Sequence, residues 1–186
     1  MNKIDYVPLD PNYYWRIRLL ADAIHEVLGT RNAIDIGCGE GMMTARLAEL
    51  GWDITGAEGS TEAISKKVPN VDIKLYDLSK PDNPAGLCEC VICTETAEHI
   101  EEEFADNVIS NVAKSGKNIM VWSAAKPGQL WPGHINLQPR EYWLNKLSKY
   151  GWVVDKSKTF HLRTVMVQLG TQHSSADDNF CILVKS

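Results

Sequence analysis

"AIDIGCGEGM", residues 33–42, joins a short apolar run to three glycines within five positions. Glycine removes side chains where a backbone must approach a ligand, and it permits the tight bend between a strand and a helix. The start of the helix presents free backbone N–H groups and the positive end of its dipole, which can receive an anion or a polar cofactor tail. The stretch therefore predicts a ligand-binding turn, with a tight turn that binds nothing as the alternative.

The segments on both sides of this turn alternate between strand and helix patterns. A leading amphipathic helix is expected over 13–29, before the strand 32–36, and the helix after the glycines ends near Gly51. Further elements are expected as strands over 53–58, 72–77, 88–94 and 118–124, and as helices over 60–68, 101–116 and 139–151. Such alternation predicts an α/β fold with a parallel sheet covered by helices on both faces.

The pattern changes after residue 151. Residues 152–170 and 179–186 are expected to be extended, and the polar segment 171–178 joins them. This predicts a C-terminal antiparallel hairpin.

Composition narrows the classes of partner. The 186 residues fit one domain over 1–186, and their net charge of −5 makes nucleic acid an unlikely partner. No run nears the roughly 20 apolar residues that span a bilayer, and the start lacks the features of a secretion signal. We therefore expect a cytoplasmic protein with no membrane association. The oligomeric state does not follow from the sequence.

Three of the five cysteines crowd into "CECVIC". Strand alternation would send Cys88 and Cys90 to one face and Cys93 to the other, which does not suit a four-ligand zinc site. We expect these cysteines to be small buried hydrophobic residues.

An acid on the second strand indicates which ligand the turn binds. Glu58 follows the glycines by about 20 residues, where a carboxylate can accept hydrogen bonds from both hydroxyls of a ribose. A dinucleotide fingerprint would place a third glycine where Met42 stands, and Asp35 and Glu40 would repel a pyrophosphate. The pattern favours an adenosine cofactor with cationic groups over a nicotinamide dinucleotide.

The sequence resembles the class I S-adenosylmethionine-dependent methyltransferases over nearly its whole length. "AIDIGCGEG", "DITGAEGS", "LYDLS" and "CVICTETAEHI" are similar to four motifs of that family, in the same order and at similar separations. The resemblance implies a Rossmann-like sheet of seven mostly parallel strands with an antiparallel strand at the end. It also implies S-adenosylmethionine as cofactor and S-adenosylhomocysteine as product.

The resemblance assigns cofactor contacts residue by residue. It implies that the methionine portion lies beside Asp35, Gly37, Cys38 and Gly39, and the ribose beside Glu58 and Gly59. It further implies adenine contacts from Asp77 and the Leu78 backbone N–H, with Cys93 or Thr94 closing the site. The leading helix could bring Tyr13, Tyr14, Trp15 or Arg16 to the carboxylate end of the cofactor, although core packing explains these aromatic residues equally well.

Methyl transfer from a sulfonium is an in-line displacement, and an acceptor that carries a proton can also need a base. Histidine titrates near neutrality and suits that task. His134, in the loop after the fifth strand, is the best candidate for the base, and His99 is the second.

A metal site is the alternative use of these residues. The set Glu95, Glu98, His99 and His134 resembles the metal site of small-RNA 3'-terminal 2'-O-methyltransferases. Such a set suits Mg²⁺ or Mn²⁺, which could orient vicinal hydroxyls and lower the pKa of one of them. The chain departs from that family because it lacks a basic surface for RNA and the aspartate and aromatic pattern around the histidine.

The loop "WSAAKPGQLWPGHINLQPREYW" resembles a subgroup of small bacterial and phage methyltransferases with a G-H-x-N series. Trp131 could supply a flat wall for a sugar and Asn136 a two-way hydrogen-bonding group, or Trp131 could simply anchor the loop. We expect O-methylation of a small-molecule or glycan hydroxyl. A module that binds S-adenosylmethionine without turnover is the non-enzymatic alternative.

Overall fold

The computed structural model describes residues 13–171 and 178–186. The first half comprises α1 (Tyr14–Leu28), β1 (Asn32–Ile36), α2 (Met42–Glu49), β2 (Asp53–Glu58), α3 (Thr61–Ser65), β3 (Ile73–Leu75) and β4 (Cys88–Thr94). The second half comprises η2 (Ala97–His99), η3 (Glu102–Phe104), α4 (Ala105–Ser115), β5 (Gly116–Ser123), α5 (Arg140–Ser148), β6 (Trp152–Val154), α6 (Lys156–Leu169) and β7 (Cys181–Lys185).

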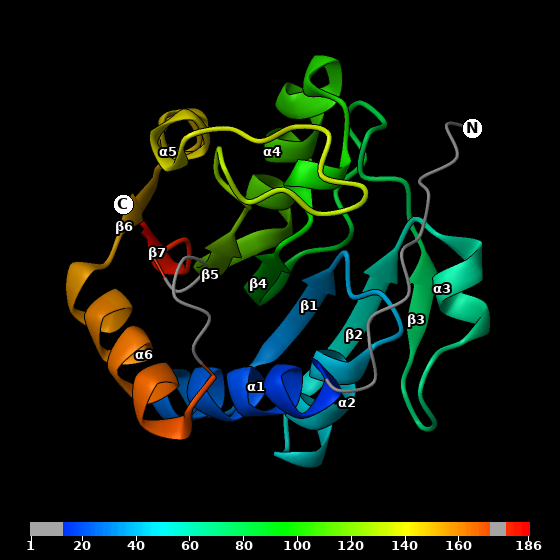
Figure 1. Cartoon of the computed structure of the whole chain (residues 1–186), viewed down its shortest axis with the longest axis vertical. Coiled ribbons are helices and arrows are strands. Elements are labelled where there is room, and N and C mark those ends of the chain that lie inside the picture. Colours follow the sequence, from blue (N-terminus) through cyan, green and yellow to red (C-terminus); the bar gives the residue numbers. More distant parts are fainter. Residues whose placement is uncertain (1–12, 172–177) are drawn as a thin grey trace.

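The strands form one seven-stranded sheet in the order β3-β2-β1-β4-β5-β7-β6. The five strands β3, β2, β1, β4 and β5 are parallel to one another, whereas β7 is antiparallel to both β5 and β6. The chain leaves β1 in one direction and returns to its other side with β4, which makes this the switch point where open α/β sheets bind ligands. The predicted α/β Rossmann-like sheet is confirmed (Figure 1).

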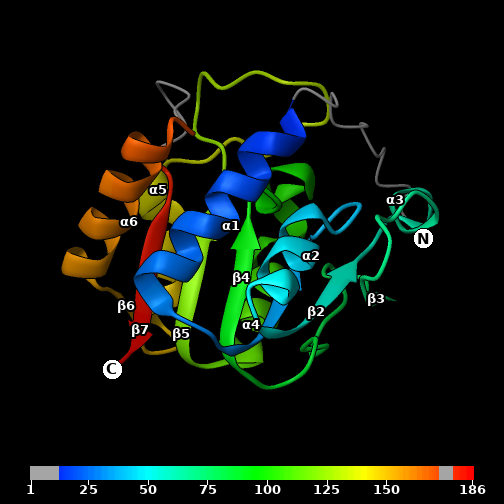
Figure 2. The same cartoon turned by 90° about the horizontal axis from the view of Figure 1, so that it is seen from below.

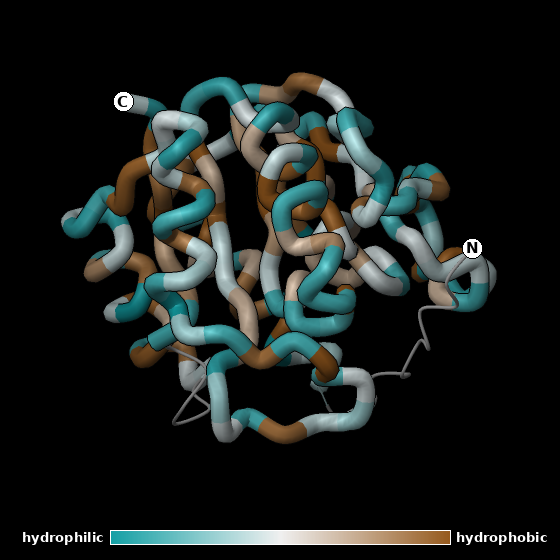
Figure 3. The backbone as a smooth tube through the Cα atoms, turned by 90° about the horizontal axis from the view of Figure 1, so that it is seen from above, coloured by the Kyte–Doolittle hydropathy of each residue, from teal (hydrophilic) through white to brown (hydrophobic). Residues whose placement is uncertain are grey.

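Helices cover both faces of the sheet (Figures 1 and 2). Apolar residues of α1, α2 and α6 pack on one face around Ile24, Leu47 and Leu162, which are fully buried. The other face packs against α4 and α5, where Val112 and Trp143 are buried. In Figure 3 hydrophobic segments concentrate in the central strands, and hydrophilic segments predominate on the outer helices and loops. No helix in the described part of the chain combines the length and apolar character needed to cross a membrane.

The C-terminal prediction is wrong in one respect, because most of 152–170 is helical. Strand β6 has three residues, and α6 follows it with fourteen. The Asp155 carboxylate caps α6 by accepting from the Lys158 N–H (2.9 Å), and Gly170 ends the helix at a φ of 74°. Leu162 and Met166, one turn apart, are buried against α1. This packing outweighs the strand preference of the β-branched residues in the segment. The predicted antiparallel pairing at the C-terminus is confirmed for β6 and β7, but a helix rather than a turn joins these two strands.

The expected face of Cys88 is also wrong. The register of β4 against β5 shifts between Cys88 and Cys90, as a bulge does. Cys88 therefore packs against the same core cluster as Cys93, whereas Cys90 lies in the opposite one. The cysteines are all free, and Cys90 and Cys93 are fully buried, as small hydrophobic residues would be.

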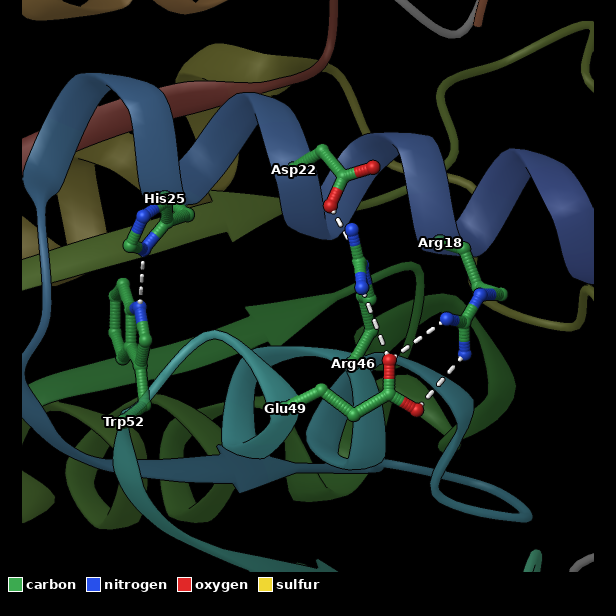
Figure 4. A network of polar contacts seen from close by, with 6 residues as sticks. All are labelled: Arg18, Asp22, His25, Arg46, Glu49 and Trp52. Carbon is green, nitrogen blue, oxygen red and sulfur yellow. Dashed lines mark hydrogen bonds and ion pairs between the residues drawn. The ribbon is translucent and has the colours of Figure 1, made fainter.

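A network of ion pairs joins α1 to α2 (Figure 4). The Arg46 guanidinium donates to Asp22 (2.7 Å) and to Glu49 (3.0 Å), and Glu49 also accepts from Arg18 (2.7 Å). These side chains are about one-quarter to one-half exposed, so solvent screens the charges. At the far end of the interface Trp52 Nε1 donates to His25 Nδ1 (3.1 Å).

Replacing Arg46 with alanine should lower the free energy of unfolding by about 1 kcal/mol, because a partly exposed network contributes modestly. Most of the loss should disappear in high salt, which urea unfolding at two ionic strengths would measure. The control Lys66→Ala removes a more exposed pair with Glu62 and should change stability less. A loss that does not depend on salt would show that Arg46 acts through the packing of its aliphatic stem.

Candidate functional site

The glycine turn leaves β1 at the carboxyl edge of the sheet. Gly37 and Gly39 have φ values of 75° and 57°, in the left-handed region that favours glycine. A Cβ atom at Gly37 would lie 2.3 Å from the Thr96 side chain, whereas a Cβ atom at Gly39 would meet nothing within 4 Å. The turn therefore packs tightly against the end of β4 on one side and is open at Gly39, where a ligand can approach its backbone.

Glu58, the last residue of β2, lies against this turn. Its Oε2 accepts from the Gly39 N–H (2.8 Å), and its Oε1 accepts from the Ser60 N–H (2.8 Å). Each carboxylate oxygen can accept a second hydrogen bond, so both remain able to receive ribose hydroxyls. The structure thus brings together the glycines, Glu58 and the neighbouring Gly59, and this arrangement fits an adenosine cofactor.

Asp35 and Cys38 direct their side chains into the domain. Asp35 is 3% exposed and accepts a hydrogen bond from the Thr44 hydroxyl (2.7 Å). The Cys38 Sγ atom packs on β2, where a Cβ atom at Gly56 would lie 2.6 Å from it. Burial raises the pKa of this thiol. The predicted contacts of Asp35 and Cys38 with a methionine portion therefore remain predictions, and the backbone of the turn is the part of this segment that is open to a ligand.

The pKa of Asp35 predicts a pH effect on stability. Burial raises this pKa to about 6, the Thr44 hydrogen bond lowers it, and the negative charge of Glu58 raises it. An acid whose folded-state pKa is raised contributes stability below its unfolded pKa of about 4 and loses it as the pH rises through the folded pKa. Relative to Asp35→Asn, the wild-type protein should therefore lose about 2–3 kcal/mol of stability between pH 4 and pH 6.

Denaturant unfolding of both proteins across this pH range would measure the difference. Asparagine keeps an acceptor for Thr44, so the comparison isolates the charge. A difference that stays constant with pH, or that changes in favour of the wild type, would contradict the raised pKa.

The predicted adenine contacts lie beside the end of β2. The Tyr76 N–H donates to the Glu58 carbonyl oxygen (2.8 Å), which places Asp77 next to this strand end. The Asp77 carboxylate accepts from the backbone N–H (3.1 Å) and hydroxyl (2.6 Å) of Ser79, as in an Asx turn. Leu78 is buried. Asp77 therefore shapes its own turn, and the adenine role of both residues remains a prediction.

The predicted residues at the end of β4 differ in exposure. The Cys93 side chain is fully buried in the core, so it cannot line a site. Thr94 is half-buried at the end of the strand. Of the two, only Thr94 is placed to close a cofactor site.

Four residues, Glu95, Glu98, His99 and His134, form what we call the acid–histidine cluster. Glu95 follows β4 with a φ of 49°, which is uncommon for a residue with a side chain, and its N–H donates to the Ser123 carbonyl oxygen (3.1 Å). The Glu98 carboxylate accepts from the Ala125 N–H (3.0 Å). The Glu98 carbonyl oxygen also accepts from the N–H groups of Ile135 and Asn136, so Glu98 holds both ends of the loop 124–139.

The two histidines of the cluster lie edge to face, with ring centroids 4.9 Å apart. His99 Nδ1 lies 3.0 Å from the Gly133 carbonyl oxygen, and His134 Nδ1 lies 2.7 Å from the Gln129 carbonyl oxygen. A carbonyl oxygen only accepts, so each Nδ1 carries a hydrogen and each Nε2 of a neutral ring has a free lone pair. Burial, and to a lesser extent His134, lower the pKa of His99 and favour its neutral form.

The cluster contains two buried carboxyl groups that can each accept a further hydrogen bond. When both groups are ionised, Glu95 Oε1 and Glu98 Oε2 are buried without a donor among the described residues, and a proton on one carboxyl group would bond it to the other. Burial raises the pKa of both groups, and the charge of Glu95 raises that of Glu98 further. Single ligand atoms of Glu98, His99 and His134 lie within 4.8 Å of one another. The cluster can therefore hold a proton or a cation.

Trp131 and Asn136 occupy different environments in the loop 124–139. Trp131 is 53% exposed and its ring is accessible. Asn136 is 3% exposed, and its amide donates to the Ile100 carbonyl oxygen (3.0 Å) and accepts from Gln138 (3.0 Å). Both polar groups of Asn136 thus hold the loop, which favours a structural role over the predicted acceptor contact.

The start of α1 reaches the glycine turn through Tyr14. Its hydroxyl donates to the Glu40 carboxylate (2.9 Å), a contact that the sequence does not predict. The Arg16 guanidinium lies over the rings of Tyr13 and Trp15, at 5.2 and 5.1 Å from their centroids. The leading helix is therefore tied to the turn by Tyr14.

Sequence reasoning also missed Gln129 and Asn179. Gln129 holds His134 through its carbonyl oxygen, and a hydrogen bond from Asn179 lowers the pKa of Glu95, which burial raises. Asn179 precedes β7 and is distant in sequence from Glu95, so no local pattern could have indicated it.

Comparison with known proteins identifies the family. A family model described as "Methyltransferase domain" matches residues 14–157. The chain belongs to this methyltransferase-domain family. A comparison with curated proteins found no match.

Solved structures show the same fold as this methyltransferase domain. Magnesium protoporphyrin IX methyltransferase (ChlM) from Synechocystis PCC 6803, with bound SAH, is 16% identical with a TM-score of 0.68, covering 97% of this chain and 90% of that one. A SAM-dependent methyltransferase from Archaeoglobus fulgidus is 16% identical with a TM-score of 0.63, covering 95% and 100%. The [4+2]-cyclase SpnF is 17% identical with a TM-score of 0.56, covering 90% and 79%.

Family and fold together support an S-adenosylmethionine-dependent methyltransferase, as predicted from the motifs. The family match favours this cofactor over a nicotinamide dinucleotide. The site fits S-adenosylmethionine because the Glu58 carboxylate lies against the glycine turn at Gly39, where the turn leaves space for a ligand.

Proposed function

We propose that this methyltransferase transfers a methyl group from S-adenosylmethionine to a hydroxyl of a small molecule or glycan, with His134 as general base. The observation that carries this proposal is the state of the His134 ring. Its Nδ1–H is held by the Gln129 carbonyl oxygen (2.7 Å), so Nε2 is left as a proton acceptor. The subgroup resemblance of the loop 124–139 supports a small acceptor.

One set of residues would bind the cofactor, and another would bind and deprotonate the acceptor. The glycine turn and Glu58 would hold S-adenosylmethionine, which supplies a methyl group on a sulfonium sulfur. His134 Nε2 takes the proton of the acceptor hydroxyl as the oxygen forms its bond to carbon. The Gln129 carbonyl oxygen fixes the tautomer beforehand and stabilises the imidazolium afterwards. The exposed Trp131 ring offers a flat surface to a sugar.

The position of the transferred methyl group tests this proposal. The protein is incubated with isotopically labelled S-adenosylmethionine and panels of hydroxyl-bearing small molecules and glycans, and the products are analysed by mass spectrometry. We expect label in an ether linkage. Label on nitrogen or carbon would contradict the O-methylation. Tight S-adenosylhomocysteine binding without product from any panel would favour the non-catalytic module.

A second candidate is a metal-dependent methyltransferase that uses Mg²⁺ or Mn²⁺ at the acid–histidine cluster. The observation that favours it is the buried, unpartnered oxygens of Glu95 and Glu98 beside two histidines with free Nε2 atoms. Metal-binding histidines commonly donate their other N–H to a backbone carbonyl, as both rings do here. The bound metal would orient vicinal hydroxyls and lower the pKa of one. The net charge of −5 gives no support to RNA as the acceptor.

Chelation separates the two candidates. If His134 acts as a base alone, activity should survive exhaustive treatment with a chelator. Loss of activity that Mn²⁺ or Mg²⁺ restores would replace the first candidate with the second. Electron paramagnetic resonance of added Mn²⁺ gives a readout without activity, and Glu98→Gln should abolish the bound signal if the cluster is the site.

A further inference from the structure

A cavity lies at the carboxyl edge of the sheet, beside the acid–histidine cluster. It has a volume of about 410 Å³. The polar lining comes from four separate parts of the chain, and its side chains are Lys126, Arg140, Glu141, Arg163, Asp178 and Asn179. These parts follow β5, begin α5, belong to α6 and precede β7. Figure 2 shows the loop 124–139, in yellow-green, on the side toward which the β4 arrow points.

The cavity has two cations that are not neutralised by the described residues. The Arg163 guanidinium already has partners within the protein. It donates to the carbonyl oxygens of Asp178 (2.6 Å) and Phe180 (2.9 Å) and lies 3.9 Å from the Asp178 carboxylate. Lys126 and Arg140 form no ion pair within residues 13–171 and 178–186. The acidic residues of the lining are exposed, so water solvates their charges.

Arg140 is half-buried, and one of its donor groups lacks an acceptor. Its Nε–H is inaccessible to solvent and has no hydrogen-bond partner among the described residues. The guanidinium lies near the Cys181 thiol at the start of β7, and lowers the thiol pKa, which burial raises. Arg140 is the first residue of α5, so backbone N–H groups of the first turn lie at the same wall. An anion in the cavity would pair with the accessible end of the Arg140 guanidinium and with Lys126, and would give the first-turn N–H groups a partner.

Gln129 connects this cavity to the proposed base. Its side-chain oxygen accepts from the Lys126 N–H (2.7 Å) and from the Asn179 amide (2.8 Å), both in the cavity lining. Its carbonyl oxygen accepts from His134 Nδ1 (2.7 Å). One residue therefore separates the cavity wall from the imidazole of the proposed base.

We propose that the cavity binds an oxyanion group, a phosphate or a carboxylate, carried by the acceptor whose hydroxyl is methylated beside His134. Lys126 and Arg140 are its principal contacts. This inference rests on the proposed function and defines its acceptor class as an anionic hydroxyl compound. The Arg140 fork suits two oxygens of either group, and Lys126 adds a point charge.

Inorganic phosphate and acetate serve as probes of the cavity. Thermal unfolding is followed with each anion, against chloride at equal ionic strength, for the wild type, Lys126→Gln, the double variant Lys126→Gln/Arg140→Gln and the control Lys117→Gln. Lys117 is exposed near the start of β5, at the opposite edge of the sheet, so its variant removes the same charge elsewhere. Lys126→Gln keeps the experiment informative if the double variant fails to fold.

We expect at least one anion to stabilise the wild type and Lys117→Gln alike. Affinity should be about tenfold weaker in Lys126→Gln and weaker again in the double variant, since each loses a charge-assisted contact. Stabilisation by phosphate alone would identify a phosphate group, and by acetate a carboxylate. Equal stabilisation of all four proteins, or no stabilisation of the wild type by either anion, would overturn the proposal.

S-adenosylhomocysteine binding, measured by calorimetry on the same proteins, separates this inference from the proposed function. We expect the same affinity in all four, because the cavity lining does not include the glycine turn or Glu58. Normal cofactor binding with equal anion effects would overturn the anion site alone. Absence of cofactor binding in the wild type would overturn the proposed function.

Discussion

Replacing His134 with alanine should lower the rate of methyl transfer by about 10²–10⁴-fold, the usual contribution of a positioned general base. The alanine removes Nε2, the atom that the Gln129 carbonyl oxygen orients as a proton acceptor. The affinity for S-adenosylhomocysteine should not change, because the proposed cofactor contacts come from the glycine turn after β1 and from Glu58 at the end of β2, not from the loop 124–139. The effect should therefore appear in kcat at saturating cofactor.

A matched control is available in His161→Ala. His161 is exposed on α6 and lies outside the cluster, so its removal should leave the rate unchanged. Thermal unfolding of both variants would show whether the loop 124–139 remains folded. A His134→Ala enzyme as fast as the wild type would remove His134 from the mechanism.

Replacing Gly37 with alanine should lower the free energy of unfolding by about 2–5 kcal/mol. The left-handed backbone costs about 1–2 kcal/mol for a residue with a Cβ atom, and overpacking adds about 1–3 kcal/mol. The packing term applies because the new Cβ atom would lie 2.3 Å from the Thr96 side chain. Cofactor affinity should fall as well, since the turn must move to make room.

Gly39→Ala is the matched control for this substitution. A Cβ atom there meets nothing within 4 Å, so only the backbone term applies and stability should fall by about 1–2 kcal/mol. The same Cβ atom would occupy the open side of the turn and weaken cofactor binding. Adding Thr96→Gly to Gly37→Ala should restore part of the lost stability. A Gly37→Ala protein as stable as the wild type in urea would contradict the tight packing of the turn.

Local sequence patterns predicted those features that depend on residues close together in the sequence and on the direction of the parallel strands. The glycines at the end of β1 and Glu58 at the end of β2 meet because parallel strands carry their carboxyl ends to one edge. The same logic placed the residues after β4 near the loop after β5, and the structure brings Glu98, His99 and His134 together.

Features that depend on contacts between residues far apart in the sequence could not be predicted. The helix α6 forms in a segment rich in β-branched residues because Leu162 and Met166 are buried against α1, a partner far away in the sequence. The Asn136 amide belongs to the loop scaffold because it meets Ile100, and no spacing rule indicates that contact. Arg140 and Arg163 line one cavity although α5 and α6 pack on opposite faces of the sheet, and no local pattern indicates that proximity.

The central claim is that the glycine turn and Glu58 together bind the nucleoside of S-adenosylmethionine, and calorimetric titration with S-adenosylhomocysteine tests it most directly. The wild type should bind, and Glu58→Ala should bind more weakly by about 1–3 kcal/mol, because ribose hydroxyls lose their acceptor. No heat of binding with the wild type, or equal affinity in Glu58→Ala, would contradict the claim.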